Sequence, residues 1–195
     1  MENPSADLVI RWRGGDQGAA GEIFSRYAQR LLALARSRLS VRLARHIDPE
    51  DVVQSACRSF FLGARDGRYV LKRSGDLWRL LVAITVHKLQ HQVERRSAGK
   101  RDLAREVQLD DPREPLRLPA DTLAREPTPA EAAALADMVE NLLAPLEPLQ
   151  RRMVVLRLDG NSLEEIAQEV ARSERTVRRV LEQFKESLLK ACEVP

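Results

Sequence analysis

A proline-rich acidic segment in the middle of the chain most restricts how it can fold. Seven of the ten prolines fall in residues 112–148. Proline lacks a backbone N–H and disfavours helical geometry in the residue before it, so a run such as residues 111–115 (Asp-Pro-Arg-Glu-Pro) cannot be a continuous helix. Residues 102–147 carry 11 acidic and 4 basic side chains, whereas residues 65–101 carry 3 and 10. The basic block is therefore the candidate surface for a polyanion.

This segment predicts how the chain is divided. We expect residues 98–128 to form a flexible acidic linker between two small helical domains, residues 1–97 and residues 129–195. The alternative is one compact domain with a long loop, but structureless loops beyond about 15 residues are uncommon inside compact domains. The chain is rich in Leu, Ala, Arg and Glu and only 4% aromatic. That composition favours helix over sheet, so the predicted fold class is all-α.

Several protein classes are disfavoured by what the sequence lacks. No apolar run approaches the roughly 18 residues of a membrane span, and the N-terminus has no uninterrupted apolar stretch typical of a signal peptide. The two cysteines lie far apart, which argues against a disulfide framework or a cysteine zinc site; we expect Cys57 to be a small core residue and Cys192 to be exposed. A cytoplasmic protein without membrane insertion is expected.

No pattern in the sequence indicates an enzyme. His87 and His91 have an i, i+4 spacing that can bind a metal, but the Glu that follows the first His of a zinc hydrolase is absent. A helix-surface pair is the preferred interpretation. No glycine-rich phosphate loop, carboxylate pair or nucleophile–base spacing is visible. We therefore expect no cofactor, no bound metal, no small-molecule substrate and no catalytic residue.

Three amphipathic helices are predicted in the N-terminal half. The first carries a single apolar stripe of Ile23, Tyr27, Leu31 and Leu34. The second begins after a capping Asp48 and Pro49, ends near Gly63 and buries Val52, Val53, Ala56 and Phe60. The third follows a break at residues 74–76 and places Leu77, Leu80, Leu81, Ile84 and Leu89 on its inner side. Its outer side carries Arg79, Lys88, Arg95 and Arg96.

The C-terminal half has the pattern of a helix-turn-helix. Pro148 opens one helix, which ends at residues 159–161, and Ser162 with Glu165 forms a capping box for a short helix. A second cap, Ser173, begins a longer helix. The residues that would close the angle between these two helices are Ile166, Ala167, Val170, Val177, Val180 and Leu181. Arg175, Arg178, Arg179 and Lys185 lie off that apolar stripe, where DNA is reached. The alternative is a helical hairpin with a solvated charged face.

These motifs resemble one family. Residues 146–167 resemble the start of the C-terminal domain of bacterial sigma factors of the extracytoplasmic-function (ECF) class, and Ser173 to Leu189 resembles its recognition helix. Residues 48–55 resemble the helix that binds core polymerase, and residues 77–96 resemble the promoter-melting helix. Ala171 stands where the family's turn commonly carries Gly, so a left-handed conformation is expected there without glycine.

The resemblance implies a role for particular residues. The partners would be core RNA polymerase and promoter DNA, with an anti-sigma protein as a further candidate. The residues implied for the −35 element are Ser173, Arg175, Thr176, Arg178, Arg179 and Lys185. Those implied for the −10 element are Lys72, Arg73, Trp78, Arg79, His87, Lys88, His91, Arg95 and Arg96. Those implied for polymerase are Asp48, Glu50, Asp51 and Gln54. Tyr69 or Trp78 could stack on a flipped base, with packing in the core as the alternative.

Two functions from other classes stay open at this point. A helix-turn-helix repressor or activator would bind a palindromic site as a dimer, because such domains usually occupy paired half-sites. A helical adaptor would bind no nucleic acid. Association with core polymerase would distinguish a sigma factor from both of these alternatives.

Overall fold

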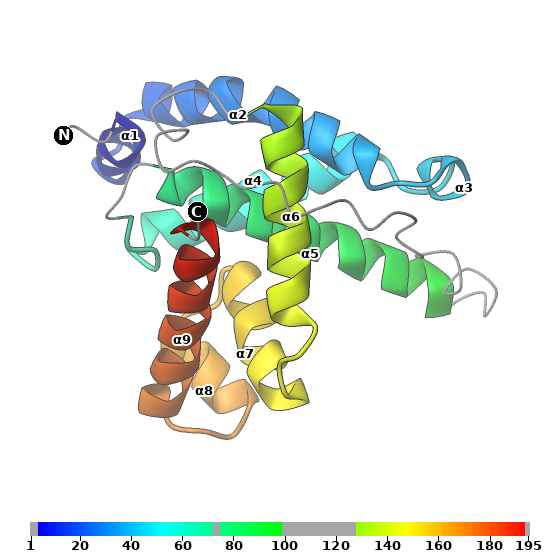
Figure 1. Cartoon of the computed structure of the whole chain (residues 1–195). Coiled ribbons are helices and arrows are strands. Elements are labelled where there is room, and N and C mark those ends of the chain that lie inside the picture. The colour runs from blue at the N-terminus through cyan, green and yellow to red at the C-terminus, as the bar shows by residue number, and fades with distance from the viewer. Residues whose placement is uncertain (1–3, 72–74, 99–127, 194–195) are drawn as a thin grey trace.

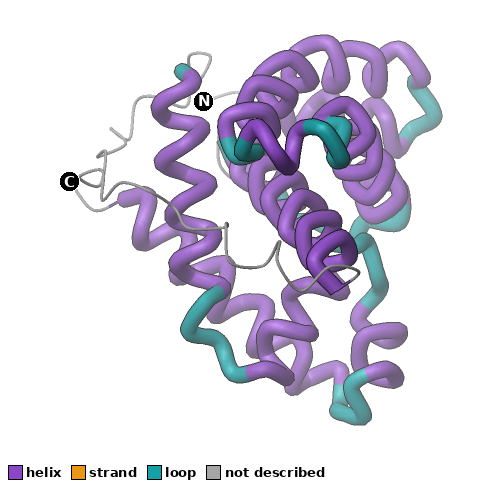
Figure 2. The backbone as a smooth tube through the Cα atoms, turned by 90° about the vertical axis from the view of Figure 1, so that its right-hand side faces the viewer, coloured by secondary structure: helices purple, strands orange, loops and turns teal. Residues whose placement is uncertain are grey.

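The fold is all-α. The computed structural model describes residues 4–71, 75–98 and 128–193, and every regular element in these ranges is a helix (Figures 1 and 2). The N-terminal half contains α1 (Pro4–Arg13), α2 (Gln17–Ser37), α3 (Val41–Ala44), α4 (Pro49–Arg65) and α5 (Asp76–Ala98). The C-terminal half contains α6 (Pro129–Leu143), α7 (Pro148–Leu158), α8 (Leu163–Glu169) and α9 (Glu174–Glu193).

The predicted helix starts are confirmed by their caps. The Asp48 carboxylate accepts the backbone N–H of Glu50 at 2.8 Å. Ser162 and Glu165 form the complete capping box, with Ser162 Oγ accepting from the Glu165 N–H and the Glu165 carboxylate accepting from the Ser162 N–H. Ser173 Oγ accepts the N–H of Thr176 at 3.2 Å. Each cap satisfies backbone donors that the first turn of a helix leaves without a partner.

One helix that the sequence prediction omitted joins the two halves. Helix α6 starts at a second capping box, formed by Thr128 and Glu131 with Pro129 at the first helical position. It packs against α2 and α5 of the N-terminal half and against α9 of its own half, and Figure 1 shows it crossing both α2 and α5. The Thr-Pro-Ala-Glu sequence carried this signal.

Helix α5 is the central element, and it is buried on more than one side. Every residue from Asp76 to His87 except Leu80 is buried. Helices α2 and α4 cover it from the N-terminal half, and α6 and α7 cover it from the C-terminal half. The expectation that Arg79 lies on an outer, solvated side is therefore wrong. Its guanidinium is buried and pairs with Asp76 at 3.3 Å, one turn earlier.

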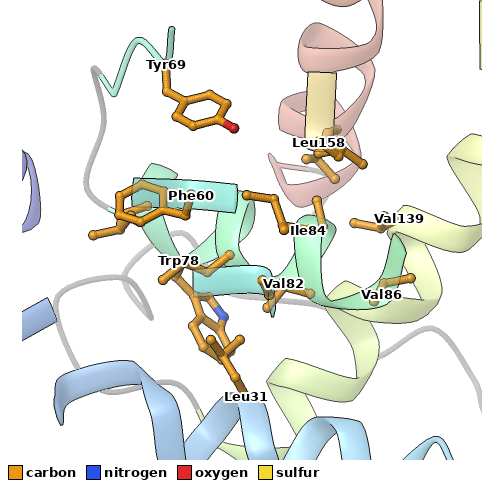
Figure 3. Packing of buried hydrophobic residues seen from close by; sticks show 14 of the residues in the cluster. Leu31, Phe60, Tyr69, Trp78, Val82, Ile84, Val86, Val139 and Leu158 are labelled. Carbon is orange, nitrogen blue, oxygen red and sulfur yellow. The ribbon is translucent and has the colours of Figure 1, made fainter. Parts of the chain in front are cut away.

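The two halves share a hydrophobic core. The apolar stripes predicted for α2 and α4 are buried, although α4 continues past Gly63 to Arg65. In Figure 3, Val139 of α6 and Leu158 of α7 lie beside Ile84 of α5. Residues 99–127 lie outside the described ranges, while Ala98 ends α5 and Thr128 caps α6. The linker at residues 98–128 and the domain limits drawn from it stay predictions.

The cysteines give one confirmed prediction and one correction. Cys57 is buried in α4, as expected. Cys192 is also buried, contrary to the prediction that it is exposed, because the end of α9 packs on α6 and brings its Sγ to 3.5 Å from Met138 Sδ. Among the described helices, none has the length and apolar character to span a membrane.

Candidate nucleic-acid and polymerase interfaces

Helices α8 and α9 form a closed helix-turn-helix angle. The apolar side chains of the two helices belong to the hydrophobic core. Those that are buried are Ile166, Ala167, Val170, Val177 and Val180, and Leu181 is partly buried. The turn passes through Ala171, whose φ of 51° is in the left-handed region. The resemblance predicted this conformation, because the family's turn commonly carries glycine at this position. The capped start of α9 is thereby held at a fixed angle to α8.

The first turns of α9 present basic side chains to solvent. Ser173, Arg175, Arg178 and Arg179 are exposed, and Thr176 is half-buried with its hydroxyl 3.0 Å from that of Ser173. Three guanidinium groups thus lie at the N-terminal end of the second helix of a helix-turn-helix, where side chains reach base edges and phosphates. Lys185 differs from the other members of the −35 set, because its Nζ donates to the backbone oxygen of Val70 at 2.9 Å.

The residues expected to meet polymerase share the exposed face of α4. Asp48, Glu50, Asp51 and Gln54 are all exposed at the start of the helix. The opposite face of α4 is in the core, so these four side chains can contact a partner without unpacking the helix. Glu50 also forms a loose ion pair with Arg36 at 3.5 Å, and about three fifths of each side chain is exposed (60% and 61%).

The residues of the −10 set are divided between surface and interior. His91, Arg95 and Arg96 are exposed along the end of α5. Trp78, Arg79 and His87 are buried, and Lys88 is half-buried. Lys72 and Arg73 lie outside the described residues.

The two candidate stacking aromatics both pack inside the protein. Trp78 stacks on Tyr27 with ring centroids 5.9 Å apart, and Tyr69 stacks on Phe60 at 6.1 Å. The Tyr69 hydroxyl lies 3.4 Å from the Arg157 carbonyl oxygen, to which it donates. Burial raises the pKa of Tyr69 to about 12, even though the charges of Arg157 and Arg68 act in the opposite direction. In this arrangement neither ring offers a free face to a base, which agrees with the core alternative.

An acidic residue that the sequence prediction passed over lies at the contact between the halves. Asp159, just after α7, accepts a hydrogen bond from Lys88 Nζ at 2.7 Å and lies 3.1 Å from His87 Nε2. Burial raises the pKa of the Asp159 carboxyl, but the hydrogen bonds and charges of His87 and Lys88 outweigh burial and lower this pKa to about 2. An acid at the negative end of a helix dipole is unfavourable unless it is paired elsewhere, and that was the available signal.

Neighbouring contacts reinforce this junction. Arg157 of α7 donates to the carbonyl oxygen of Arg68 and lies over the ring of Tyr69, 5.5 Å from its centroid. Gly160 has a φ of 94°, and a Cβ at that position would come within 3.1 Å of the Ser59 carbonyl oxygen. The left-handed backbone and this close approach of the end of α7 to the α4 backbone both favour glycine at residue 160.

A second junction joins α2 to α6. Arg38 is 10% exposed and pairs with Asp137 at 2.6 Å and with Glu140 at 3.3 Å. It also donates to the Ala133 carbonyl oxygen at 2.7 Å. Burial raises the pKa of Glu140, and the positive charge of Arg38 partly offsets that rise. No residue of this cluster was singled out from sequence, because its partners are about 100 positions apart.

The prediction that His87 and His91 form a helix-surface pair is wrong for His87, which is buried under the C-terminal half, and only His91 is exposed. The rings of His87 and His91 are 6.2 Å apart between centroids. Within the ranges that the structure describes, no group of three or more His, Cys, Asp or Glu residues could hold a metal ion. A groove between α5 and α7 is lined by both histidines together with Arg151 and Arg152.

The comparisons with known proteins agree with this geometry. The family model described as ECF sigma factor matches residues 3–193, nearly the whole chain. No curated protein and no solved structure matches the chain. A helix-turn-helix, an acidic face on α4 and a family match from end to end lead to one assignment. The chain belongs to the ECF sigma factor family, and it acts in transcription initiation with core RNA polymerase and promoter DNA as its partners.

Proposed function

We propose that the two halves of this sigma factor read two promoter elements while α4 holds the polymerase. Residues 1–97 would bind core polymerase and open the −10 element, and residues 129–195 would bind the −35 element, with residues 98–128 as the connection. The observation that carries this proposal is the exposed arginine cluster on the capped start of α9. A single basic surface would suit any polyanion, but one placed on a helix-turn-helix suits the major groove of DNA.

The −35 assignment rests on Arg175, Arg178 and Arg179. All three are exposed within the first two turns of α9, and the packed α8 behind them fixes their orientation. Arginine can donate two parallel hydrogen bonds to guanine or hold a phosphate. Ser173 and Thr176 would add hydroxyl contacts to the DNA backbone beside them.

The −10 assignment rests on the exposed end of α5. His91, Arg95 and Arg96 would hold backbone phosphates, together with Lys72, Arg73 and, once it is accessible, Lys88. Because Trp78 and Arg79 are buried, their contribution to −10 binding would be to support α5 rather than to touch a base.

The polymerase assignment rests on the four polar residues at the start of α4. An exposed, mainly acidic face can meet a basic surface of a partner, and its charges would steer the encounter. Capping alone explains Asp48, whose carboxylate is bonded to the Glu50 N–H. Glu50 and Gln54 have no such structural duty toward the start of the helix, so they are the residues we assign most directly to polymerase contact.

The test begins with core polymerase and a DNA library whose promoter region is randomised, from which transcribed sequences are selected. On a promoter selected in this way, Arg178→Ala with Arg179→Ala should lower transcription while binding to core polymerase persists. Each arginine that reads a base should cost about 1–3 kcal/mol. Arg26→Ala on the exposed face of α2 is the matched control. Unchanged promoter output from the double variant would overturn the −35 assignment.

A further inference from the structure

The chain leaves α4 through a turn that local hydrogen bonds define. The amide of Arg68 donates to the Gly63 carbonyl oxygen at 2.9 Å, and the amide of Gly67 donates to the Ala64 carbonyl oxygen at 3.1 Å. Together with a left-handed Gly67, whose φ is 68°, these two bonds form the Schellman motif that commonly ends a helix. The direction of the backbone after α4 is therefore set as far as Arg68.

The next residue, Tyr69, folds back on α4. Its ring stacks on Phe60 with centroids 6.1 Å apart, and only 8% of the residue is exposed (Figure 3). A Cβ at Gly63 would lie 2.5 Å from the nearest ring atom of Tyr69, so a larger residue there would displace the ring. The chain is thus fixed on α4 at Tyr69 and returns to the surface at Val70, which is 60% exposed.

Arg13, the last residue of α1, holds the same turn from a third element. Its Nε donates to the Ala64 carbonyl oxygen at 2.7 Å, and one of its terminal nitrogens donates to the Tyr69 carbonyl oxygen at 2.9 Å. A charged donor strengthens both hydrogen bonds, and positive charge is favourable at the C-terminal end of a helix. The guanidinium therefore ties the backbone beyond the turn to the last turn of α4, entirely within the N-terminal half.

Two residues of the −10 set follow this turn. Lys72 and Arg73 come three and four residues after Tyr69 in the sequence, and α5 begins at Asp76. Asp76 is buried and pairs with Arg79, so the start of α5 is also anchored. Because each residue spans at most about 3.5 Å of chain, fixing the backbone at Tyr69 limits where the Lys72 and Arg73 side chains can act.

We propose that Arg13 is a positioning residue for −10 binding. It holds the Tyr69 backbone against the end of α4 and thereby fixes the part of the chain from which Lys72 and Arg73 reach the DNA backbone. Arg13 itself does not touch the DNA. Holding a binding segment in place reduces the conformational entropy that binding must remove. The role in DNA binding rests on the proposed function, whereas the hydrogen bonds of Arg13 do not depend on it.

The test compares two arginines of the same helix. Arg13→Met removes the donors and keeps most of the side-chain length, and Arg11→Met is the matched control, because the Arg11 guanidinium pairs with Asp16 and Glu22 instead. Each chain is mixed with core polymerase, and opening of a selected promoter is followed by the fluorescence of 2-aminopurine in the −10 element. Affinity for core polymerase and the melting temperature of each chain are measured alongside.

We expect Arg13→Met to slow promoter opening about tenfold and Arg11→Met to change it by less than about twofold, with affinity for core polymerase unchanged in both. Arg13→Lys keeps one charged donor and should recover part of the rate. Gly63→Ala displaces the Tyr69 ring from the other side, so it should also slow opening. If Arg13→Met is not folded at the assay temperature, Gly63→Ala takes its place in the comparison below.

A double-mutant cycle distinguishes positioning from a general structural role. If Arg13 acts through Lys72 and Arg73, Arg13→Met should slow opening no further in a chain that already carries Lys72→Gln and Arg73→Gln. Equal slowing in both backgrounds, or a wild-type opening rate in folded Arg13→Met, would overturn the proposal. The proposed function fails separately, if the wild-type chain with core polymerase gives no promoter-specific transcripts.

Discussion

At the scale of single residues, Ala171 and Asp159 show how the molecule departs from local preference. Ala171 has a φ of 51°, a conformation in which a Cβ crowds the following carbonyl oxygen. The buried contacts of α8 with α9 hold the turn in this shape despite that cost. The helix-turn-helix therefore stores a small amount of strain in its turn.

Ala171→Gly should relieve this strain. Left-handed geometry costs a residue with a Cβ about 1–2 kcal/mol in the folded chain, and glycine avoids this cost. Glycine also has more conformational freedom in the unfolded chain, which offsets about half of the stabilisation. We expect a net increase of about 0.5–1 kcal/mol in the free energy of unfolding, measured by chemical denaturation. The matched control is Ala144→Gly, an exposed alanine with a helical φ of −58°, which should destabilise the protein instead. A lower free energy of unfolding for Ala171→Gly than for the wild type would mean that the turn is not strained.

Asp159 gives a prediction for acid pH. The pKa of its carboxyl falls from the ordinary 3.8 to about 2 in the folded chain. A lowered folded pKa means that the charged group stabilises the fold fully above pH about 4 and loses that contribution as pH falls toward 2. The difference in free energy of unfolding between the wild type and Asp159→Asn should therefore be constant above pH about 4 and shrink below it. Its upper limit is about 2 kcal/mol before screening at this partly exposed side chain.

The measurement is chemical denaturation of both chains at a series of pH values. Glu169→Gln, whose residue is exposed and pairs within its own half, provides the comparison. A difference for Asp159→Asn that stays the same down to pH about 2 would mean that the carboxylate is not stabilised by Lys88 and His87.

At the scale of the elements, the sequence was most informative where a helix has one apolar face. Helices α2, α4, α8 and α9 bury the residues that their periodicity predicts, with Leu181 of α9 only partly buried, because one side packs and the other is solvated. Helix α5 could not be described in this way. The side that carries Arg79 and His87 is covered by elements far away in the chain, and no periodicity within α5 reports their presence.

The candidate site was predictable to the same extent. The exposed arginines of α9 and the acidic start of α4 follow from capping residues and helical spacing, which are local properties. The pairing of Asp159 with Lys88 joins positions 71 residues apart, and the Arg38 cluster with Glu140 joins positions 102 apart. Such contacts depend on how the halves pack, so the sequence alone did not reveal them.

The polar face of α4 yields a prediction about the polymerase. Glu50→Arg with Gln54→Arg changes two exposed side chains, and surface changes usually alter stability by under about 0.5 kcal/mol. Positive charge placed against a basic partner costs several kcal/mol, so affinity for core polymerase should fall by orders of magnitude. Gln29→Arg with Ala33→Arg, one turn apart on the exposed face of α2, is the control. If the folded double variant binds core polymerase with normal affinity, this face of α4 does not contact the polymerase.

At the scale of the whole molecule, the proposed function requires one chain to hold a polymerase and to read two promoter elements. The family match covers residues 3–193, so both halves belong to a single functional unit. The described halves are also packed on one another, because α6 and α7 both contact α5.

Mixing the purified chain with core RNA polymerase tests the sigma-factor assignment, which requires two results together. We predict that the chain elutes with core polymerase in gel filtration and that the mixture transcribes from specific promoters, whereas core polymerase alone does not. The chain without polymerase should bind no palindromic DNA as a dimer. Specific binding to a palindrome without polymerase, or the absence of any complex with core polymerase, would contradict the sigma-factor assignment.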